Sequence, residues 1–146
     1  MEDIGPGPAG LDTCVFIYFI EEHPQFLPLV EPVFTAIDAG ALQGVTSSLT
    51  LHETLVAPYR AGDQALAVRY EALLTQSRGL RLVALDRSLL RAAAQLRAQA
   101  RLKAPDAFQI AAALGMHCLV YLTNDRDLPP VPKLRILQLR SYLPVP

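Results

Sequence analysis

Acidic residues occur at four places in this chain where an apolar segment begins or ends. The motifs that contain them are Leu11-Asp12-Thr13, Leu51-His52-Glu53-Thr54-Leu55, Pro105-Asp106-Ala107-Phe108 and Leu122-Thr123-Asn124-Asp125-Arg126-Asp127. Carboxylates avoid burial unless they are paired or bound to a metal ion. If the fold gathers four of them, their mutual repulsion raises their pKa values unless a cation compensates. Hard divalent cations such as Mg²⁺ suit oxygen ligands and act on phosphates, so the pattern predicts a metal-dependent nuclease.

Each acid also has an ordinary structural interpretation. Asp12 and Asp125 follow predicted strands, and Asp is common in turns. Glu53 could be an exposed helical carboxylate. Asp106 lies at a predicted helix start, where the helix dipole stabilises a carboxylate by about 0.3–1 kcal/mol without any function. Asp127 is either a supporting acid or a polar loop residue, so the prediction depends on the order and settings of the acids taken together.

Alternating strands and helices are predicted to position these acids. Apolar runs, caps and turn residues predict strands at 9–11, 42–46, 80–85, 118–123 and 134–139, and helices at 27–39, 47–58, 63–76, 87–101 and 105–114. The apolar run 13–20 fits a buried strand or a buried helix, and a helix that starts just after Asp12 and is ended by His23-Pro24 is favoured. Ser47 and Ser48 are expected to cap the helix that carries Glu53, and Pro58 should kink or stop it. The alternation predicts an α/β fold with a mainly parallel sheet of about four to five strands, covered on both faces. Ligands of such sheets bind beyond the carboxyl ends of the strands.

Length and composition favour one domain with a substantial core. The chain has 146 residues, of which 51% are hydrophobic and 18% are charged, so a disordered chain is not expected. Residues 1–8 are rich in Gly and Pro and are predicted to form a flexible leader before a domain at 9–146. No apolar run reaches the roughly 18–20 residues needed to cross a bilayer. Because no Lys or Arg precedes Arg60, a secretion signal is not expected either, and a cytoplasmic location is predicted.

The two cysteines, Cys14 and Cys118, do not have the spacing of a metal or redox motif. In a chain without a secretion signal, they are expected to be reduced thiols. A disulfide between them is one alternative, and a reactive Cys14 beside a distant His is another.

A net charge of −1 conceals a strong asymmetry. Residues 1–59 contain eight acids and no Lys or Arg, giving −8, whereas residues 60–146 contain thirteen Lys or Arg and six acids, giving +7. The halves either neutralise each other across the fold, or one supplies metal ligands while the other attracts phosphates. On the predicted helix 87–101, an arc of about 120° holds four arginines: Arg87, Arg91, Arg97 and Arg101. This basic stripe is either a solvated face or a surface that contacts RNA or a partner.

Taken together, these motifs resemble the PIN-domain ribonucleases, most closely the VapC-type toxins of toxin–antitoxin modules. The matching stretches are Leu11-Asp12-Thr13-Cys14-Val15, Ser47 to Glu53, Pro105-Asp106-Ala107 and Leu122-Thr123-Asn124-Asp125. The resemblance covers nearly the whole chain and implies a single PIN-like α/β/α sandwich domain. It implies an endoribonuclease whose Mg²⁺ or Mn²⁺ ligands, and hence catalytic residues, are Asp12, Glu53, Asp106 and Asp125. Thr123 matches a hydroxyl position near that site, and Asn124 and Asp127 are expected to support it.

The resemblance also implies partners, namely an RNA substrate, a VapB-type antitoxin and a second copy of the chain in a homodimer or higher oligomer. Apolar residues of the early helices, such as Phe16 and Phe34, would contact the antitoxin or belong to the core. One departure is Cys14, which stands where the family often has Asn. It favours the alternative of a non-catalytic PIN-like domain that binds RNA or protein. A haloacid-dehalogenase-type phosphoryl transfer at Asp12 fits poorly, because Cys14 occupies the position of the second acid.

Overall fold

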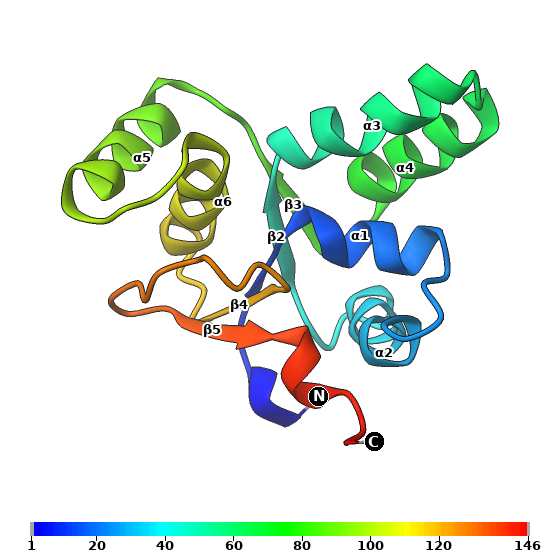
Figure 1. The fold of residues 1–146 in the computed structure, drawn as a ribbon, viewed down its shortest axis with the longest axis horizontal. Coiled ribbons are helices and arrows are strands. Elements are labelled where there is room, and N and C mark those ends of the chain that lie inside the picture. Colours follow the sequence, from blue (N-terminus) through cyan, green and yellow to red (C-terminus); the bar gives the residue numbers. More distant parts are fainter. Residues whose placement is uncertain (1, 146) are drawn as a thin grey trace.

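Five parallel strands form the central sheet in the computed structural model, which describes residues 2–145 (Figure 1). The strands are β1 Ala9–Leu11, β2 Gly44–Ser47, β3 Leu80–Val83, β4 Val120–Thr123 and β5 Arg135–Gln138, in the spatial order β3-β2-β1-β4-β5. The central strand β1 pairs with β2, where Ala9 lies opposite Gly44, and with β4, where Leu11 lies opposite Leu122. The predicted parallel sheet is therefore confirmed.

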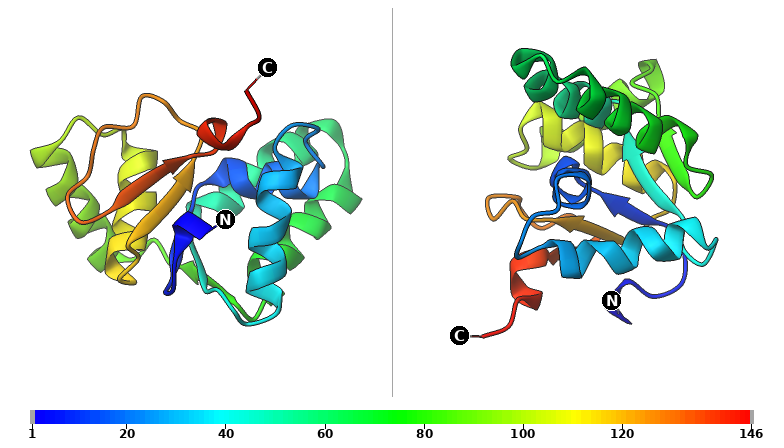
Figure 2. Two further views of the ribbon diagram at one scale, coloured as in Figure 1. Left: turned by 90° about the horizontal axis from the view of Figure 1, so that it is seen from below. Right: turned by 90° about the vertical axis from the view of Figure 1, so that its right-hand side faces the viewer.

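Helices cover both faces of this sheet (Figures 1 and 2). Within the described residues they are α1 Thr13–Ile20, α2 Leu27–Asp38, α3 Leu49–Ala61, α4 Gln64–Gln76, α5 Arg87–Gln99 and α6 Ala104–Gly115, together with the short 3₁₀ turns η1 Glu2–Ile4 and η2 Leu139–Tyr142. Helices α1 to α4 lie on one side, whereas α5 and α6 pack against each other on the opposite side. The α/β/α sandwich predicted from the sequence is thus confirmed.

Alternate residues of the central strands point into two different cores, as the pleat of a strand requires. Leu11 and Leu122 point into the larger core, which they share with α1 and α2. Tyr121 points to the other side, into the core beneath α6. Gly10 lies on that same side, and a Cβ atom there would come within 2.8 Å of the Tyr121 ring and 2.9 Å of the Ala113 methyl group. The glycine therefore allows α6, which carries Asp106, to lie close to the sheet.

Side-chain caps define several helix starts. The predicted caps Asp63 and Asp86 accept hydrogen bonds from first-turn N–H groups of α4 and α5, at 3.0 and 2.9 Å. The Ser48 side chain does not cap α3 as predicted, because its hydroxyl accepts a hydrogen bond from the Leu85 N–H at 3.2 Å. The hydroxyl of Ser47 accepts one from the first N–H of α3 at 3.3 Å instead. Ser48 therefore occupies the predicted N-cap position of α3, but the side-chain hydrogen bond to the first turn comes from Ser47, the last residue of β2.

Some element ends differ from the sequence prediction for identifiable reasons. Pro58 does not stop α3, which continues to Ala61. The helix ends at Gly62, whose φ of 70° is in the left-handed region that favours glycine. Strand β2 begins at Gly44 rather than Leu42, because the Leu42 N–H donates to a carbonyl of α2. Strands β3, β4 and β5 are likewise shorter by one or two residues at an end.

The segment before β1 contacts the other end of the chain. Ile4 is buried in the larger core, the Tyr142 hydroxyl donates to the Asp3 carboxylate at 2.7 Å, and the Arg135 guanidinium donates to the Asp3 carbonyl. The flexibility of residues 1–8 stays a prediction. Met1 and Pro146, at the ends of the predicted leader and domain, lie outside the described residues.

The state of the two cysteines and the possibility of a membrane-spanning helix were both considered in the sequence predictions. Cys14 and Cys118 are both free, so the disulfide alternative does not hold. Burial and then the Asp12 carboxylate raise the pKa of Cys14 to about 12, which makes it a poor nucleophile at neutral pH. Among residues 2–145, no helix combines the length and the apolar character needed to span a membrane.

Candidate functional site

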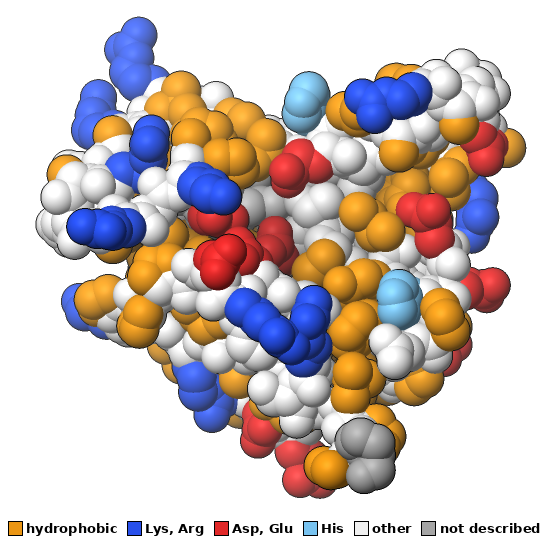
Figure 3. All heavy atoms as spheres, in the orientation of Figure 1, with side chains coloured by type: hydrophobic (Ala, Val, Ile, Leu, Met, Phe, Trp, Pro, Cys, Tyr) orange, Lys and Arg blue, Asp and Glu red, His pale blue; other side chains and the backbone are white. Residues whose placement is uncertain are grey.

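The four predicted acids lie on one face of the molecule, beyond the carboxyl ends of the strands. Asp12 directly follows β1 and caps α1, and Asp125 lies two residues after β4. Glu53 projects from α3, and Asp106 lies in the first turn of α6. Three of these side chains are partly buried, and that of Glu53 is exposed. Figure 3 shows acidic side chains gathered near the middle of this face.

Both oxygens of the Asp12 carboxylate accept hydrogen bonds from the protein. The Thr13 N–H donates to Oδ1 at 2.8 Å, and the Thr123 hydroxyl donates to Oδ2 at 2.7 Å. The Thr123 oxygen in turn accepts the Asp125 N–H at 3.1 Å. One hydroxyl therefore links the acids that follow β1 and β4, which is the contact expected of a residue that orients a carboxylate.

Glu53 is oriented through Thr13 and Gln109, and Gln109 is not among the residues predicted from the sequence. The Glu53 Oε1 accepts the Thr13 hydroxyl at 2.7 Å, and the Thr13 oxygen accepts the Gln109 Nε2 at 3.2 Å. Gln109 is only 3% exposed and also contacts Thr50 and Ser47. Its signal in the sequence was a glutamine within the apolar part of the helix that starts near Asp106, because a buried amide needs polar partners.

The four carboxylates share one electrostatic environment. Burial is the largest cause that raises the pKa of Asp106 to about 6, followed by the charges of Asp125 and Asp12 and, more weakly, Glu53. Lys103 acts in the opposite direction. Repulsion of this kind requires the acids to lie near one another, because charges in water-exposed positions are screened over about 10 Å. The structure therefore brings together the acids that the sequence analysis grouped.

The donor chemistry suits a hard divalent cation, although the side chains are not already arranged as a closed ligand shell. Four carboxylates supply oxygen donors, and a cation would relieve their repulsion. Within residues 2–145, no three His, Cys, Asp or Glu side chains form a ready-made metal cluster. Asp12 and Glu53 are held instead by Thr123 and Thr13. The backbone places Asp12 and Asp125 directly beyond two paired strands, and the Thr123 hydroxyl links them.

Asn124 and Asp127 stabilise the loop around Asp125 rather than adding oxygen donors to it. The Asn124 amide donates to the Tyr18 hydroxyl at 3.1 Å, and its carbonyl accepts the Arg140 N–H at 3.2 Å. Asp127 contacts Asp125 through its backbone N–H, at 2.9 Å from Oδ1. These contacts support the shape of the loop, and a direct role for either side chain in metal binding stays a prediction.

Comparison with known proteins identifies the family to which this chain belongs. A model of the PIN domain matches residues 10–134, which is most of the chain. The chain belongs to the PIN domain family. A comparison with curated proteins found no significant match.

Several solved structures share the PIN fold. A chain of VapBC2 from Rickettsia felis, bound to a DNA fragment from its promoter, has a TM-score of 0.69 and 14% identity, with 90% of this chain and 98% of that chain covered. VapC20 of Mycobacterium tuberculosis, a toxin that cleaves the sarcin–ricin loop, has a TM-score of 0.66 and 16% identity, with 83% and 92% covered. DNA-bound VapBC from Salmonella typhimurium has a TM-score of 0.62 and 23% identity, with 92% and 98% covered. At these identities the likeness establishes the fold.

The basic stripe of this PIN domain is shorter than predicted. Arg87, Arg91 and Arg97 are exposed on α5, and Figure 3 shows Lys and Arg side chains around that helix. The Nε of Arg97 donates to the Leu102 carbonyl at 3.0 Å, which fixes the turn after the helix. Arg101 lies beyond the end of α5, because the chain turns there to bury Leu102, so its predicted place on the stripe was wrong. Contact of these residues with RNA or a partner stays a prediction.

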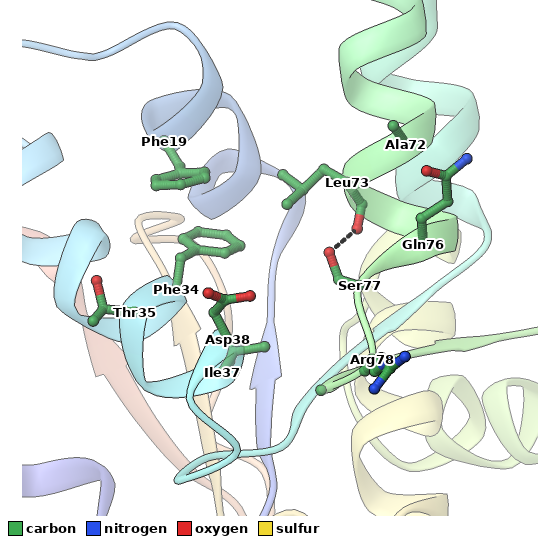
Figure 4. A pocket seen from close by; sticks show the side chains of 11 residues that line it. Phe19, Phe34, Thr35, Ile37, Asp38, Ala72, Leu73, Gln76, Ser77 and Arg78 are labelled. Atoms are coloured by element: carbon green, nitrogen blue, oxygen red, sulfur yellow. Dashed lines mark hydrogen bonds between the residues drawn. The ribbon is translucent and has the colours of Figure 1, made fainter.

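One hollow of the PIN domain lies apart from the acids. It encloses about 640 Å³ between α2 and α4 and is lined by Phe19, Phe34 and Leu73, with Asp38 and Arg78 also in its wall (Figure 4). The Phe19 and Phe34 rings are stacked, with centroids 4.1 Å apart. None of the four acids is among its lining residues. Its wall combines apolar side chains with polar and charged ones, among them Gln76 and Ser77.

Proposed function

We propose that this PIN domain is a metal-dependent endoribonuclease that hydrolyses RNA phosphodiester bonds. Asp12, Glu53, Asp106 and Asp125 would hold Mg²⁺ or Mn²⁺. The observation that carries the proposal is that Asp12 and Asp125 follow two paired parallel strands and are linked through the Thr123 hydroxyl. Burial, and then the charges of Asp125 and Asp12, raise the pKa of the nearby Asp106 to about 6. A bound divalent cation would lower the pKa of an attacking water and neutralise charge that develops on the phosphate.

Three of the four acids would have distinguishable roles at the site. Asp12 is held at both oxygens by protein donors, so its role is to present a carboxylate in a fixed orientation. Asp106 is crowded by burial and by the neighbouring acids, which raise its pKa to about 6, so a bound cation would relieve that crowding. Asp125 would complete the oxygen donors from the loop after β4.

The direct test is cleavage of RNA by the purified protein in Mg²⁺, in Mn²⁺ and in a chelator. Cleavage is expected with either ion and is expected to stop in the chelator. Asp12→Asn and Asp125→Asn should each abolish cleavage while the circular dichroism spectrum stays unchanged. Glu31→Gln, an exposed acid on α2, is the matched control and should cleave normally. Undiminished cleavage by both site variants would refute the assignment.

We also propose that the protein is the toxin of a VapBC-type module and binds a VapB-type antitoxin. The support is its fold, which it shares with chains of VapBC complexes from Rickettsia felis and Salmonella typhimurium. The hollow beside the stacked rings of Phe19 and Phe34 would receive an antitoxin side chain. Co-expression with a small protein from a neighbouring gene should relieve growth inhibition and yield a stable complex. Ala72→Arg, in the wall of the hollow, should weaken that complex without reducing RNA cleavage.

We also propose that the protein forms a homodimer. Light scattering of the purified protein would measure the mass of the particle and so test this proposal.

A second candidate is a non-catalytic PIN domain that binds RNA or protein. Cys14 favours it, because the amide that the family often places there would orient a neighbouring carboxylate. Titration with Mn²⁺, with and without RNA, discriminates between the two functions. Tight RNA binding without metal binding or cleavage would support the non-catalytic domain.

A further inference from the structure

One buried amide connects three of the elements around the acids. The Gln109 side chain projects from α6, which carries Asp106, and contacts β2 through Ser47, α3 through Thr50 and α1 through Thr13. We infer that Gln109 and Thr13 form a hydrogen-bond relay that positions Glu53 for a divalent ion. The inference rests on the proposed function, since it assigns a positioning role at that same site.

The orientation of the amide follows from one obligatory donor. The Ser47 backbone N–H can only donate, and it lies 3.1 Å from the Gln109 Oε1. The Ser47 hydroxyl donates to the same oxygen at 2.8 Å. The Nε2 group must therefore point the other way, and it does so toward the hydroxyls of Thr50 at 2.7 Å and Thr13 at 3.2 Å. Reversing the amide would place its NH₂ group against the Ser47 N–H, donor against donor, and would leave that buried N–H without this acceptor.

This orientation directs the hydrogen of the Thr13 hydroxyl. Because the Thr13 oxygen accepts from the Gln109 Nε2, its own hydrogen is free to donate to the Glu53 Oε1 at 2.7 Å. The Thr50 hydroxyl likewise accepts from Nε2, and it also lies 2.7 Å from the Thr46 hydroxyl and 3.2 Å from the Thr13 hydroxyl. The relay therefore ends on the Glu53 carboxylate. It connects this exposed side chain to a glutamine that is only 3% exposed.

Holding Glu53 matters for metal binding because ligands need a fixed orientation. Residues that hydrogen-bond a metal ligand from behind typically change metal affinity by about 10- to 100-fold when they are replaced. Gln109 and Thr13 are positioning residues in this sense, since each acts on the ion only through Glu53. Neither residue needs to touch the substrate.

Thr13 supplies the cleaner test because it is only partly buried. Thr13→Val keeps the shape of the side chain and removes the donor, whereas Thr13→Ser keeps the donor. We expect Thr13→Val to weaken Mn²⁺ binding, measured by calorimetry, by about 10-fold or more, and Thr13→Ser to restore it to within about 2-fold. Thr75→Val on α4 is the matched control and should bind as the wild type does. Equal Mn²⁺ affinity of the Val variant and the wild type would overturn the relay.

Gln109 tests the direction of the relay. Gln109→Glu nearly keeps the size of the side chain but replaces the donor that faces Thr13 with an acceptor, so the Thr13 hydrogen would turn away from Glu53. Its effect on Mn²⁺ affinity should not add to that of Thr13→Val, because both changes interrupt one chain of hydrogen bonds. Full additivity would contradict a common path. If the Gln109 variant does not fold, the two Thr13 variants still decide the inference.

The outcomes also separate this inference from the proposed function. A wild-type protein that binds no Mn²⁺ and cleaves no RNA would overturn the proposed function, and the relay with it. A wild type that binds and cleaves, beside a Thr13→Val variant that does both equally well, would overturn the relay alone. In the expected case, Thr13→Val lowers cleavage at limiting Mn²⁺, and saturating Mn²⁺ largely restores kcat.

Discussion

Replacing Asp106 with Asn is expected to stabilise the metal-free protein, although most substitutions at partly buried sites destabilise. The reason is that the carboxylate is crowded by burial and by the charges of Asp125 and Asp12, which raise its pKa from 3.8 to about 6. An amide has nearly the same shape and carries no charge. The substitution therefore removes repulsion while it keeps the start of α6 intact.

The sign and size of the effect follow from the difference in pKa between the folded and unfolded states. Below pH 3.8, Asp106 is protonated in both states and its contribution to stability is fully present. As the pH rises through about 6, the folded state must ionise a disfavoured carboxylate and that contribution is lost. The difference corresponds to at most about 3 kcal/mol. Because the side chain is only partly buried, solvent screening reduces this to about 1 kcal/mol, or about 2–4 °C in Tm.

The assay is thermal unfolding of wild type and Asp106→Asn between pH 4 and pH 8 in a chelator, with Glu31→Gln as a control. The advantage of the Asn variant should grow from pH 4 to about pH 6 and stay constant above about pH 7. Adding Mg²⁺ should raise the Tm of the wild type and have a smaller effect on the variant. Parallel curves at all pH values, or a less stable variant at pH 7.5 without metal, would refute the electrostatic reasoning.

Three further predictions concern activity, packing and RNA contact. Metal-supported cleavage should decline below about pH 6, because protonation of Asp106 competes with the cation, and a flat pH–rate profile down to pH 5 would contradict this. Gly10→Ala should lower the unfolding free energy by about 1–3 kcal/mol in urea, because its methyl group would press on Ala113, and a loss under about 0.5 kcal/mol would show that α6 moves away freely. Reversing the charge of Arg87 and Arg91 should reduce the salt dependence of RNA binding, and an unaltered slope would remove the basic stripe from the RNA footprint.

The fold could be predicted from the sequence because its signals are local. Asp63 and Asp86 stand directly before apolar helical patterns, and both cap the helices that follow them. Alternation of strands and helices implies a parallel sheet, and a parallel sheet places the residues after β1 and β4 at the same edge. The positions of Asp12 and Asp125 therefore followed from the topology. The acidic pattern predicted a metal-dependent nuclease, whereas RNA as the substrate and the antitoxin as the partner were implied by the resemblance to a family.

The rest of the site could not be predicted because its contacts are not local. Gln109 bonds to residues that lie 62, 59 and 96 positions away, namely Ser47, Thr50 and Thr13. No periodicity or motif reports such a network. The same limit explains the error at Ser48, whose expected cap is replaced by a contact with the Leu85 N–H, 37 positions away. At Gln109 and at Ser48, the side-chain contact is made with a residue distant in the sequence, and no local pattern indicates that partner.

The edge of the sheet that carries the four acids is subject to both destabilising electrostatic effects and stabilising packing. Strand topology and the close approach of α6 at Gly10 bring the acids together, and ionising Asp106 there costs about 1 kcal/mol, first because it is partly buried and then because of the neighbouring charges. The Gln109 network and the apolar cores on both sides of the sheet hold the acids in place. A divalent ion at 100 times its Kd would add about 2.7 kcal/mol of stability, which exceeds the cost of ionising Asp106. Thermal stability should therefore depend on metal most strongly above pH 6, where Asp106 is ionised. Titration of Tm against Mg²⁺ should accordingly give a larger increase in Tm at pH 7.5 than at pH 5, and equal increases at the two pH values would contradict a cation bound beside Asp106.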